Sequence, residues 1–543
     1  MNLSAEFIGK DRMSVSCPFN ESTKVMLSWL PRSKYRSADR AWIADATPAA
    51  AWRLREAGFE IDKTLKGLAD DFGIDHDVEV SQPENRIHDS WIHQCSIYSR
   101  LRTSKMAMLD VQMGLGKSKV IVDEFVNAKF TSGIVVCPKS VLGVWRREFR
   151  TFAGDAVEVL VLEKGSSTKK HKDAKQFMDR CRLNGVPHVV VINYESIWRG
   201  DLGKLFKQYS YSVIVADESH RIKSQSGKAS KYLSSIASQA EHRRCLSGTP
   251  LAHSPVDSFA QFRFLDPGLF GTSWSAFRNR YAISGPFGKN HIVGYRHLDE
   301  LSELMARVTI KMTLDDTDIK LPDLIIQDYS VPLESKTWKA YREIEIDLVT
   351  RVASGEVTVE NALTRLMKLR QITSGFIKDE DGVVHDIGQE KINALRDILE
   401  DIPPGEPVVV FCNFTEDLER IRNLAGKLNL NYGEISGRQK DLTQDSKMPE
   451  RIDLMGVQIQ SGGTGIDLTR SRYVFYYDMT YSLSDYKQSL ARAHRPGQTR
   501  TTHVGHLVAE DTVDRKVYKA LQKREDVIES VLEYLREFQK NMN

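Results

Sequence analysis

The sequence predicts an α/β protein with two lobes, each a parallel sheet flanked by helices, preceded by a small α+β domain. Short, continuous apolar runs rich in β-branched residues alternate with longer helical patterns, and the alternation occurs twice along the chain. Runs of this kind are typical of strands buried on both faces of a parallel sheet. Eight runs carry the pattern: residues 107–109, 134–136, 189–192 and 213–215, then 408–411, 457–459, 473–477 and 503–508.

Composition narrows the class of protein. The 543 residues are 41% hydrophobic, enough for several cores. No apolar run reaches the roughly 18 residues that cross a bilayer, and residues 1–10 lack the apolar centre of a signal peptide, so we expect no membrane association. The six cysteines form no Cys-x-x-Cys pair, which favours a reducing, cytoplasmic compartment without structural zinc. A net charge of +3 does not by itself indicate a nucleic-acid partner.

Residues 1–80 form the predicted N-terminal domain. Pro18-Phe19-Asn20 precedes a basic segment that contains Lys34 and Arg36, and Trp42 follows. Interleaved aromatic and basic side chains can stack on bases and neutralise phosphates, so Lys34, Arg36 and Trp42 are candidate nucleic-acid contacts. Core packing of Phe19 or Trp42 remains the alternative.

The first lobe, residues 85–318, contains a glycine-rich loop that is a candidate phosphate-binding site. Residues 113–118 read Met-Gly-Leu-Gly-Lys-Ser, directly after an expected strand. The glycines would let backbone amides face a triphosphate, Lys117 would reach its β and γ phosphates, and the Ser118 hydroxyl would bind Mg²⁺. The full phosphate-loop pattern needs a glycine where Val111 stands, so the loop alone is a weak signal.

A second stretch completes the predicted site. The run 213–216 ends in Asp217-Glu218. Asp217 would hold Mg²⁺, and Glu218 would orient the attacking water. Gln94, 23 residues before Lys117, is a candidate for adenine recognition through its amide, with a surface glutamine as the alternative. Together the two stretches predict an ATPase that uses ATP and Mg²⁺.

The second lobe, residues 319–543, contributes a basic block. Residues 275–390 are mostly helical in pattern, with a turn at 321–323 near the lobe boundary. Within 488–498, Arg492 and Arg495 are three residues apart and would lie on one face of a helix. Such arginines can stabilise a γ-phosphate in the transition state. The last 30 residues have near-helical spacing of apolar side chains and predict a helix packed on this lobe.

From about Ile87 to the C-terminus, these blocks resemble the motifs of the Swi/Snf-type branch of superfamily 2 helicase-like ATPases, in the family's order. The resemblance implies two RecA-like lobes and assigns roles residue by residue. It implies nucleotide binding by Met113, Gly114, Leu115, Gly116, Lys117, Ser118 and Gly465. It implies catalysis by Lys117, Asp217, Glu218, Gln488, Arg492 and Arg495, and DNA contacts by Lys139, Ser140, Asn193, Thr249 and Thr464.

The resemblance further implies a monomeric motor that translocates on double-stranded DNA. The N-terminal segment resembles the HARP domain of annealing helicases, which favours branched DNA and a role in replication, recombination or repair. Single-strand-binding, replication or recombination proteins would be its expected partners. Two alternatives stay open: a strand-separating helicase and an ATP-driven displacer of DNA-bound proteins. The compact size favours a bacterial or phage source, with a nuclear location left open.

Overall fold

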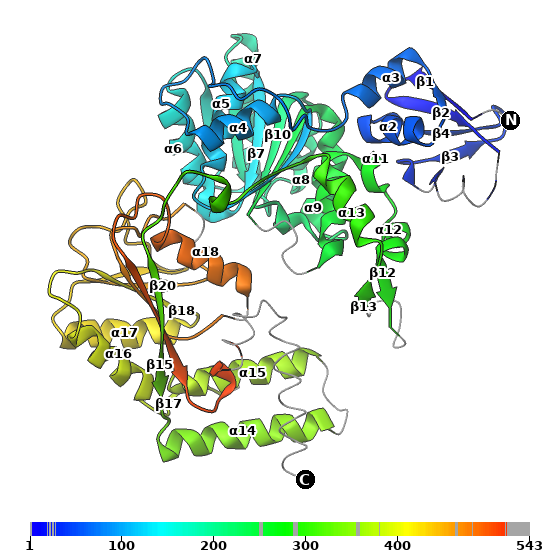
Figure 1. Cartoon of the computed structure of the whole chain (residues 1–543). Coiled ribbons are helices and arrows are strands. Elements are labelled where there is room, and N and C mark those ends of the chain that lie inside the picture. The colour runs from blue at the N-terminus through cyan, green and yellow to red at the C-terminus, as the bar shows by residue number, and fades with distance from the viewer. Residues whose placement is uncertain are drawn as a thin grey trace. The chain divides into compact units, whose positions relative to one another are not determined.

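The structure, a computed structural model, describes most of the chain between residues 3 and 517. The described residues are 3–18, 20, 23, 26–27, 29–248, 254–285, 292–353, 359–379, 381–461, 465–480, 482–515 and 517, without the side chains of 348–363 and 484. They fall into two compact units, Met1–Asp318 and Ile319–Asn543, which are treated separately below (Figure 1).

The described part of the N-terminal domain has a five-stranded sheet and the helices α2 and α3, in agreement with the expected α+β class. Its strand order is β3-β4-β2-β1-β5, and a small core of aliphatic side chains lies between sheet and helices. The elements are β1 (Ser4–Gly9), β2 (Arg12–Ser16), β3 (Lys34–Arg36), β4 (Ala41–Asp45), α2 (Pro48–Glu56), β5 (Glu60–Ile61) and α3 (Lys63–Asp70).

A seven-stranded parallel sheet forms the centre of the first unit, as expected, in the order β14-β6-β11-β10-β7-β9-β8. Its strands are β6 (Met106–Val111), β7 (Ser132–Cys137), β8 (Glu158–Val161), β9 (His188–Asn193), β10 (Tyr211–Asp217), β11 (Ala240–Ser247) and β14 (Thr309–Met312). All four runs predicted for this lobe lie within strands, whereas β8, β11 and β14 were not identified from the sequence.

Helices flank this sheet, and a helical insertion follows β11. The helices are α4 (Ile92–Leu101), α5 (Lys117–Asn127), α6 (Leu142–Ala153), α7 (Ser167–Leu183), α8 (Gly200–Phe206), α9 (Lys228–Ile236) and α10 (Ser258–Leu265). The insertion contains α11 (Pro267–Phe270), α12 (Trp274–Tyr281), the hairpin β12 (Ala282–Ser284) and β13 (Ile292–Tyr295), and α13 (Leu298–Ala306). Figure 1 draws α11 beside α2 of the N-terminal domain, and the backbone N–H of Ala49 donates to Oδ2 of Asp266 there at 3.0 Å.

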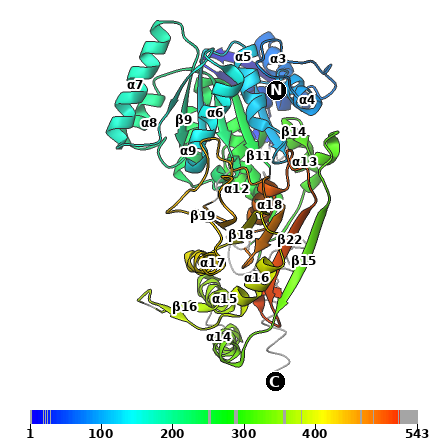
Figure 2. The same cartoon turned by 90° about the vertical axis from the view of Figure 1, so that its left-hand side faces the viewer.

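The second unit has a six-stranded parallel sheet in the order β15-β22-β21-β18-β20-β19. Its strands are β15 (Leu324–Val331), β18 (Val408–Cys412), β19 (Tyr432–Ile435), β20 (Leu454–Gln458), β21 (Tyr473–Tyr476) and β22 (Thr502–Ala509). The remaining elements are α14 (Ser335–Ala353), α15 (Val359–Thr373), β16 (Phe376–Lys378), β17 (Val384–Asp386), α16 (Glu390–Glu400), α17 (Thr415–Lys427) and α18 (Leu483–Ala493). In both Figure 1 and Figure 2, α14 and α15 lie side by side.

Two expectations for this part of the chain need correction or stay untested. The segment 275–390 is less helical than predicted, because it contains the eight-residue strand β15. Most side chains of β15 are exposed, since it is an edge strand of its sheet, so it lacks the continuous apolar run by which β18, β20, β21 and β22 were recognised. The strand β19 was not identified from the sequence either. The helix predicted for the last 30 residues lies outside the described residues.

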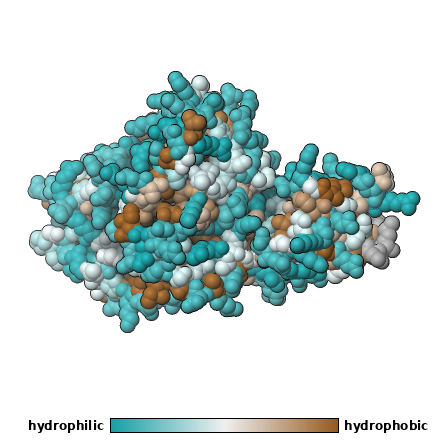
Figure 3. Space-filling view, turned by 90° about the horizontal axis from the view of Figure 1, so that it is seen from above, coloured by the Kyte–Doolittle hydropathy of each residue, from teal (hydrophilic) through white to brown (hydrophobic). Residues whose placement is uncertain are grey.

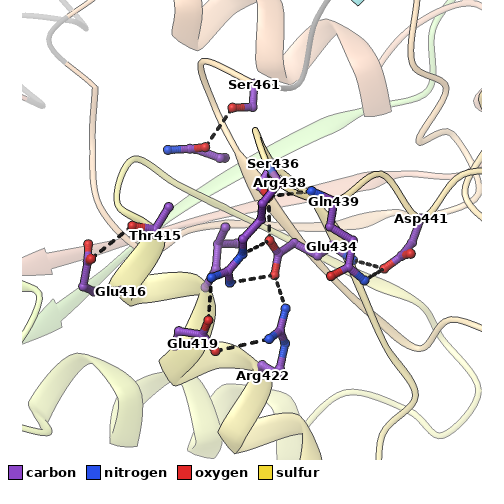
Figure 4. Close-up of polar contacts among 12 residues, drawn as sticks. Thr415, Glu416, Glu419, Arg422, Glu434, Ser436, Arg438, Gln439, Asp441 and Ser461 are labelled. Atoms are coloured by element: carbon purple, nitrogen blue, oxygen red, sulfur yellow. Dashed lines mark hydrogen bonds and ion pairs between the residues drawn. The ribbon is translucent and has the colours of Figure 1, made fainter.

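A buried carboxylate organises one end of the second sheet. Glu434, at the end of β19, is fully buried and accepts from Arg422 at 2.5 Å, Arg438 at 2.8 Å and the Ser436 hydroxyl at 2.6 Å (Figure 4). Glu419 of α17 also pairs with both arginines. The network fixes the loop after β19 against α17.

Hydrophilic residues cover most of the face drawn in Figure 3, with hydrophobic residues scattered between them. Among the described helices, none is long and apolar enough to span a membrane.

Candidate nucleotide-binding site

The glycine-rich loop connects β6 to α5 in the first unit. Gly114 and Gly116 have φ angles of +86° and +80°, which glycine adopts without steric cost. Gly116 is the N-cap of α5, and Lys117 and Ser118 form the first turn of that helix. The loop therefore presents a helix N-terminus, where backbone N–H groups and the helix dipole favour an anion. Leu115 is buried and anchors the loop, whereas Met113 is half-buried.

Lys117 lies among carboxylates. Its Nζ donates to the carbonyl of Val111 at 2.5 Å. Burial lowers the pKa of Lys117, while the charges of Glu218, Asp217 and Asp110 raise it. The lysine that the sequence assigns to phosphate binding is thus close to both carboxylates of the second predicted stretch.

The amide of Gln94 braces the loop from α4. Its Oε1 accepts the backbone N–H of Trp91 at 3.1 Å, and its Nε2 donates to the carbonyl of Leu115 at 3.4 Å. A Cβ added to Gly116 would lie 2.2 Å from this Nε2, so only glycine fits there. His93 contacts the same Leu115 carbonyl through Nε2 at 3.0 Å. Adenine recognition by Gln94 stays a prediction.

Asp217 is held by two aromatic side chains at the end of β10. The indole N–H of Trp145 donates to its Oδ2 at 2.8 Å, and the Tyr194 hydroxyl donates to its backbone carbonyl at 2.7 Å. Burial raises the pKa of Asp217, and the neighbouring Glu218 charge raises it further. A positive charge bound beside Asp217 would oppose both effects and lower its pKa.

Glu218 follows in a left-handed conformation, with φ of +52°. A non-glycine residue in this region costs energy and is found preferentially at functional sites. Its Oε2 is buried and accepts no hydrogen bond from the described residues, with His220 Nδ1 3.4 Å away. Burial by itself raises the pKa of Glu218, but the His220 ring and the Lys117 charge lower it, and the net shift is downward.

These residues fit ATP and Mg²⁺. The half-buried Asp217 and the buried Glu218, whose Oε2 has no hydrogen-bond partner among the described residues, lie close to Lys117. Hard divalent cations prefer carboxylate and hydroxyl oxygens, which Asp217 and Ser118 carry. The backbone amides of the loop would bind the phosphates.

Three of the candidate DNA contacts lie near the carboxyl ends of the strands of the first sheet, as the glycine-rich loop and Asp217 do. Cys137 and Asn193 are register partners at the ends of β7 and β9. Lys139 is exposed and Ser140 half-buried in the short turn after β7, while Asn193 donates to Oε2 of Glu195 at 2.6 Å. Thr249 and Thr464, two further candidates, lie outside the described residues.

The basic block of the second unit differs from expectation in one respect. Arg492 is in the last turn of α18, but the helix ends at Ala493, so Arg495 does not share a helical face with it. Pro496 disfavours the helical conformation at Arg495, which explains the end. Arg492 is buried, and Gln488, on the same helix, and Arg495 are half-buried.

Contacts within the second unit connect this block to the segment of Gly465, whose φ is +92°. The Arg492 carbonyl accepts the backbone N–H of Leu468 at 3.0 Å. The Gln498 amide donates to the carbonyls of Thr469 and Ser471 at 3.0 and 3.1 Å.

The candidates in the N-terminal domain lie on a strand pair. Lys34 and Arg36 are exposed on β3 and pair in register with Ile43 and Ala41. Trp42 instead pairs with Tyr35, 54% exposed, at a ring distance of 5.5 Å. Because directly opposed residues share a face, Trp42 lies on the opposite face from the two basic residues. Tyr35, an exposed aromatic residue between the two basic residues, was not among the predicted contacts.

Comparisons with known proteins agree with this arrangement. The model of the SNF2-related domain matches residues 57–375, more than half of the chain, and that of the helicase conserved C-terminal domain matches residues 390–497.

Among curated proteins, the DNA repair and recombination protein RDH54 of Saccharomyces cerevisiae is 25% identical over 71% of this chain and 44% of its own length. YwqA of Bacillus subtilis is 23% identical, over 79% and 46%. Chromodomain-helicase-DNA-binding protein 1-like of Mus musculus is 25% identical, over 82% and 49%.

The chain therefore spans about half the length of these relatives. A solved structure of the Sulfolobus solfataricus SWI2/SNF2 ATPase core in complex with double-stranded DNA is 23% identical, with a TM-score of 0.40, over 84% of this chain and 98% of that one.

Proposed function

This chain belongs to the SNF2-related family, and from that membership we propose that it is a DNA-dependent ATPase that translocates on double-stranded or branched DNA. Its product would be remodelled or reannealed DNA in replication, recombination or repair. The names of the relatives support this direction, because one acts in DNA repair and recombination and another is a helicase that binds DNA.

One observation carries the ATPase proposal. Lys117, at the N-terminus of α5, is near enough to Asp217 and Glu218 for their charges to raise its pKa against the effect of burial. An anion-binding helix terminus and a metal-binding carboxylate are the two parts that triphosphate hydrolysis requires, and this lysine belongs to the first and lies close to the second.

In the proposed mechanism, the loop amides and Lys117 bind the β and γ phosphates. Ser118 and Asp217 would hold Mg²⁺, whose positive charge would offset the negative charge of the triphosphate. Glu218 orients the attacking water. Gln94 positions the loop and contacts the base. The second unit contributes Arg492 and Arg495, which stabilise transition-state charge, with Gln488 and Gly465 in supporting roles.

The DNA part of the proposal rests on phosphate contacts. Lys139, Ser140 and Asn193 of the first unit, with Thr249 and Thr464, bind the backbone, and Lys34, Arg36 and Trp42 bind through the N-terminal domain. Backbone contacts carry little sequence information, and they predict an activity that falls steeply with salt.

The test is ATP hydrolysis by the full chain without DNA and with single-stranded, blunt duplex or forked DNA. Lys117→Ala is the loss-of-activity control, and Lys204→Ala, an exposed substitution on α8, is the matched neutral control. Stimulation by duplex or forked DNA that is lost only in Lys117→Ala supports the proposal. Stimulation by single strands alone would replace it with a strand-separating helicase, and no hydrolysis under any condition would overturn it.

A further inference from the structure

A cavity lies at the opposite edge of the first sheet from the candidate nucleotide-binding site. It measures about 670 Å³ and is lined by residues of the N-terminal domain and by residues at the amino ends of β6 and β11, such as Met106 and Ala240. The glycine-rich loop follows the carboxyl end of β6, and Asp217 is the residue at the carboxyl end of β10. In a parallel sheet these are opposite edges, so the two sites are separate.

Arg243 is a cation buried in the wall of this cavity. Its side chain is 7% exposed, and its Nε is buried without a hydrogen-bond partner. Within the part of the chain that the structure describes, its guanidinium donates no hydrogen bond and forms no ion pair within 4.0 Å. The adjacent Arg244 points to the other face of β11. Its guanidinium donates hydrogen bonds to the Glu124 carboxylate and to backbone carbonyls.

Burial lowers the pKa of Arg243, and Asp266 is the acidic group whose charge most opposes that effect, but the two side chains form no ion pair within 4.0 Å. Asp266 accepts the backbone N–H groups of Ala49 at 3.0 Å and Gly268 at 2.7 Å.

Asp11 and Glu241 also line the cavity, and neither forms an ion pair with Arg243. Asp45 pairs with Arg12 and Arg32, and Asp71 pairs with Lys105. None of them compensates the Arg243 charge by direct contact.

Other walls of the cavity add positive charge. Arg263 of α10 donates to neutral oxygens, namely Ser234 Oγ and Ser230 Oγ at 3.2 Å and the Gln225 carbonyl at 3.3 Å. Lys231 of α9 is exposed at the rim. In total, six basic and four acidic side chains line the cavity, so its wall carries a net positive charge of two.

A buried guanidinium with no anion in direct contact is costly unless a ligand supplies the charge. Guanidinium groups recognise phosphate oxygens with particular geometric fit, and serine hydroxyls from α9 can add hydrogen bonds. The volume is within the range of sites that take small organic ligands. We propose that this cavity binds a phosphate-bearing ligand, with Arg243 as its central contact and Arg263 and Lys231 beside it.

The first measurement is thermal unfolding of the full chain with sodium pyrophosphate, against sodium chloride at equal ionic strength. The background is Lys117→Ala, which weakens anion binding at the glycine-rich loop. We expect pyrophosphate to raise the melting temperature by about 2–4 °C in this background, and the rise to vanish when Arg243→Met is added. The melting temperature without ligand should not fall in Arg243→Met, because an unpaired buried charge is removed.

Lys231→Gln, an exposed change that leaves folding intact, gives an independent readout, and we expect it to reduce the shift. Lys204→Gln, on the surface of α8, is the matched control and should leave it unchanged. An equal pyrophosphate shift with and without Arg243→Met and Lys231→Gln, or no shift at all in Lys117→Ala, would overturn the proposal.

Measurements of DNA affinity distinguish two sources of the phosphate group, the DNA backbone and a free phosphorylated compound. If Arg243→Met weakens binding of a short duplex at least threefold and pyrophosphate competes with that duplex, the ligand is a DNA backbone phosphate. If duplex affinity is unchanged while the pyrophosphate shift is lost, the ligand is a free phosphorylated compound. Neither readout depends on ATP hydrolysis, so this proposal and the proposed function can fail separately.

Discussion

Trp145 and Asp217, 72 residues apart in sequence, are joined by a hydrogen bond of 2.8 Å from the indole N–H to Oδ2. Trp145 is on α6 and almost fully buried, so it holds the carboxylate in one orientation at the end of β10. Loss of a partner that orients a metal-binding carboxylate typically lowers metal affinity or activity about 10–100-fold.

We therefore predict that Trp145→Phe weakens the apparent Mg²⁺ affinity of the ATPase about 10–100-fold while the fold is retained. Phenylalanine preserves most of the packing but donates no hydrogen bond. The measurement is the rate of ATP hydrolysis against Mg²⁺ concentration, with Trp198→Phe, a half-buried tryptophan of the same unit, as the control. An unchanged Mg²⁺ midpoint in Trp145→Phe would show that this hydrogen bond does not position the metal ligand.

Gln94→Ala distinguishes recognition of adenine from support of the loop. If the Gln94 amide hydrogen-bonds to adenine, the variant should lose about tenfold or more of the preference of the enzyme for ATP over GTP. A site built to hydrogen-bond one base strongly rejects a base that leaves its polar groups unpaired. If the amide only braces Leu115 and Trp91, as its hydrogen bonds allow, the KM values for both nucleotides should rise together. Steady-state kinetics with ATP and GTP decide between these outcomes.

The candidate catalytic and nucleotide-binding residues of the first unit could be predicted from the sequence because they lie at the ends of strands that are continuous apolar runs. β6 and β10 are buried along most of their length, the glycine-rich loop follows β6, and Asp217 is the last residue of β10. β11, which lies between them in the sheet, was missed because Arg243 and Arg244 interrupt its apolar pattern.

Features that depend on long-range contacts could not be predicted. The hydrogen bond of Trp145 to Asp217 has no local signature, since each residue looks like an ordinary member of its own motif. The end of α18 at Ala493 had a local signal in Pro496, which the spacing argument for Arg492 and Arg495 did not take into account.

Arg244 and Glu124 form a buried ion pair that should be important for stability. Both side chains are at most 2% exposed, with Nη2 and Oε1 2.5 Å apart. We predict that Glu124→Leu lowers the free energy of unfolding of the first unit by about 3–5 kcal/mol, because it leaves a buried charge unpaired. The measurement is urea-induced unfolding.

The double variant Glu124→Leu with Arg244→Met should be less destabilised than the sum of the single variants, since no buried charge remains. Asp201→Asn, which breaks the exposed pair with Lys204, is the control and should change stability little. Additive losses in the double variant would mean that the two side chains are not coupled.

Asp417, on the first turn of α17, should make the stability of the second unit depend on pH. It is fully buried, and neither carboxylate oxygen has a hydrogen-bond partner among the described residues. Burial, and then the nearby Asp478, raise the pKa of Asp417 well above its ordinary value, against the charges of Lys391 and Arg420.

Because its pKa is higher in the folded than in the unfolded state, the stabilisation from the protonated carboxyl is complete below pH about 4 and is lost as pH rises through the folded-state pKa. An asparagine side chain does not titrate, so Asp417→Asn should gain stability relative to the natural chain as pH increases. Urea-induced unfolding at pH 5, 7 and 8.5 measures this difference, with the exposed Asp401→Asn as the control. A difference that stays constant over this range would mean that Asp417 does not change its protonation on unfolding.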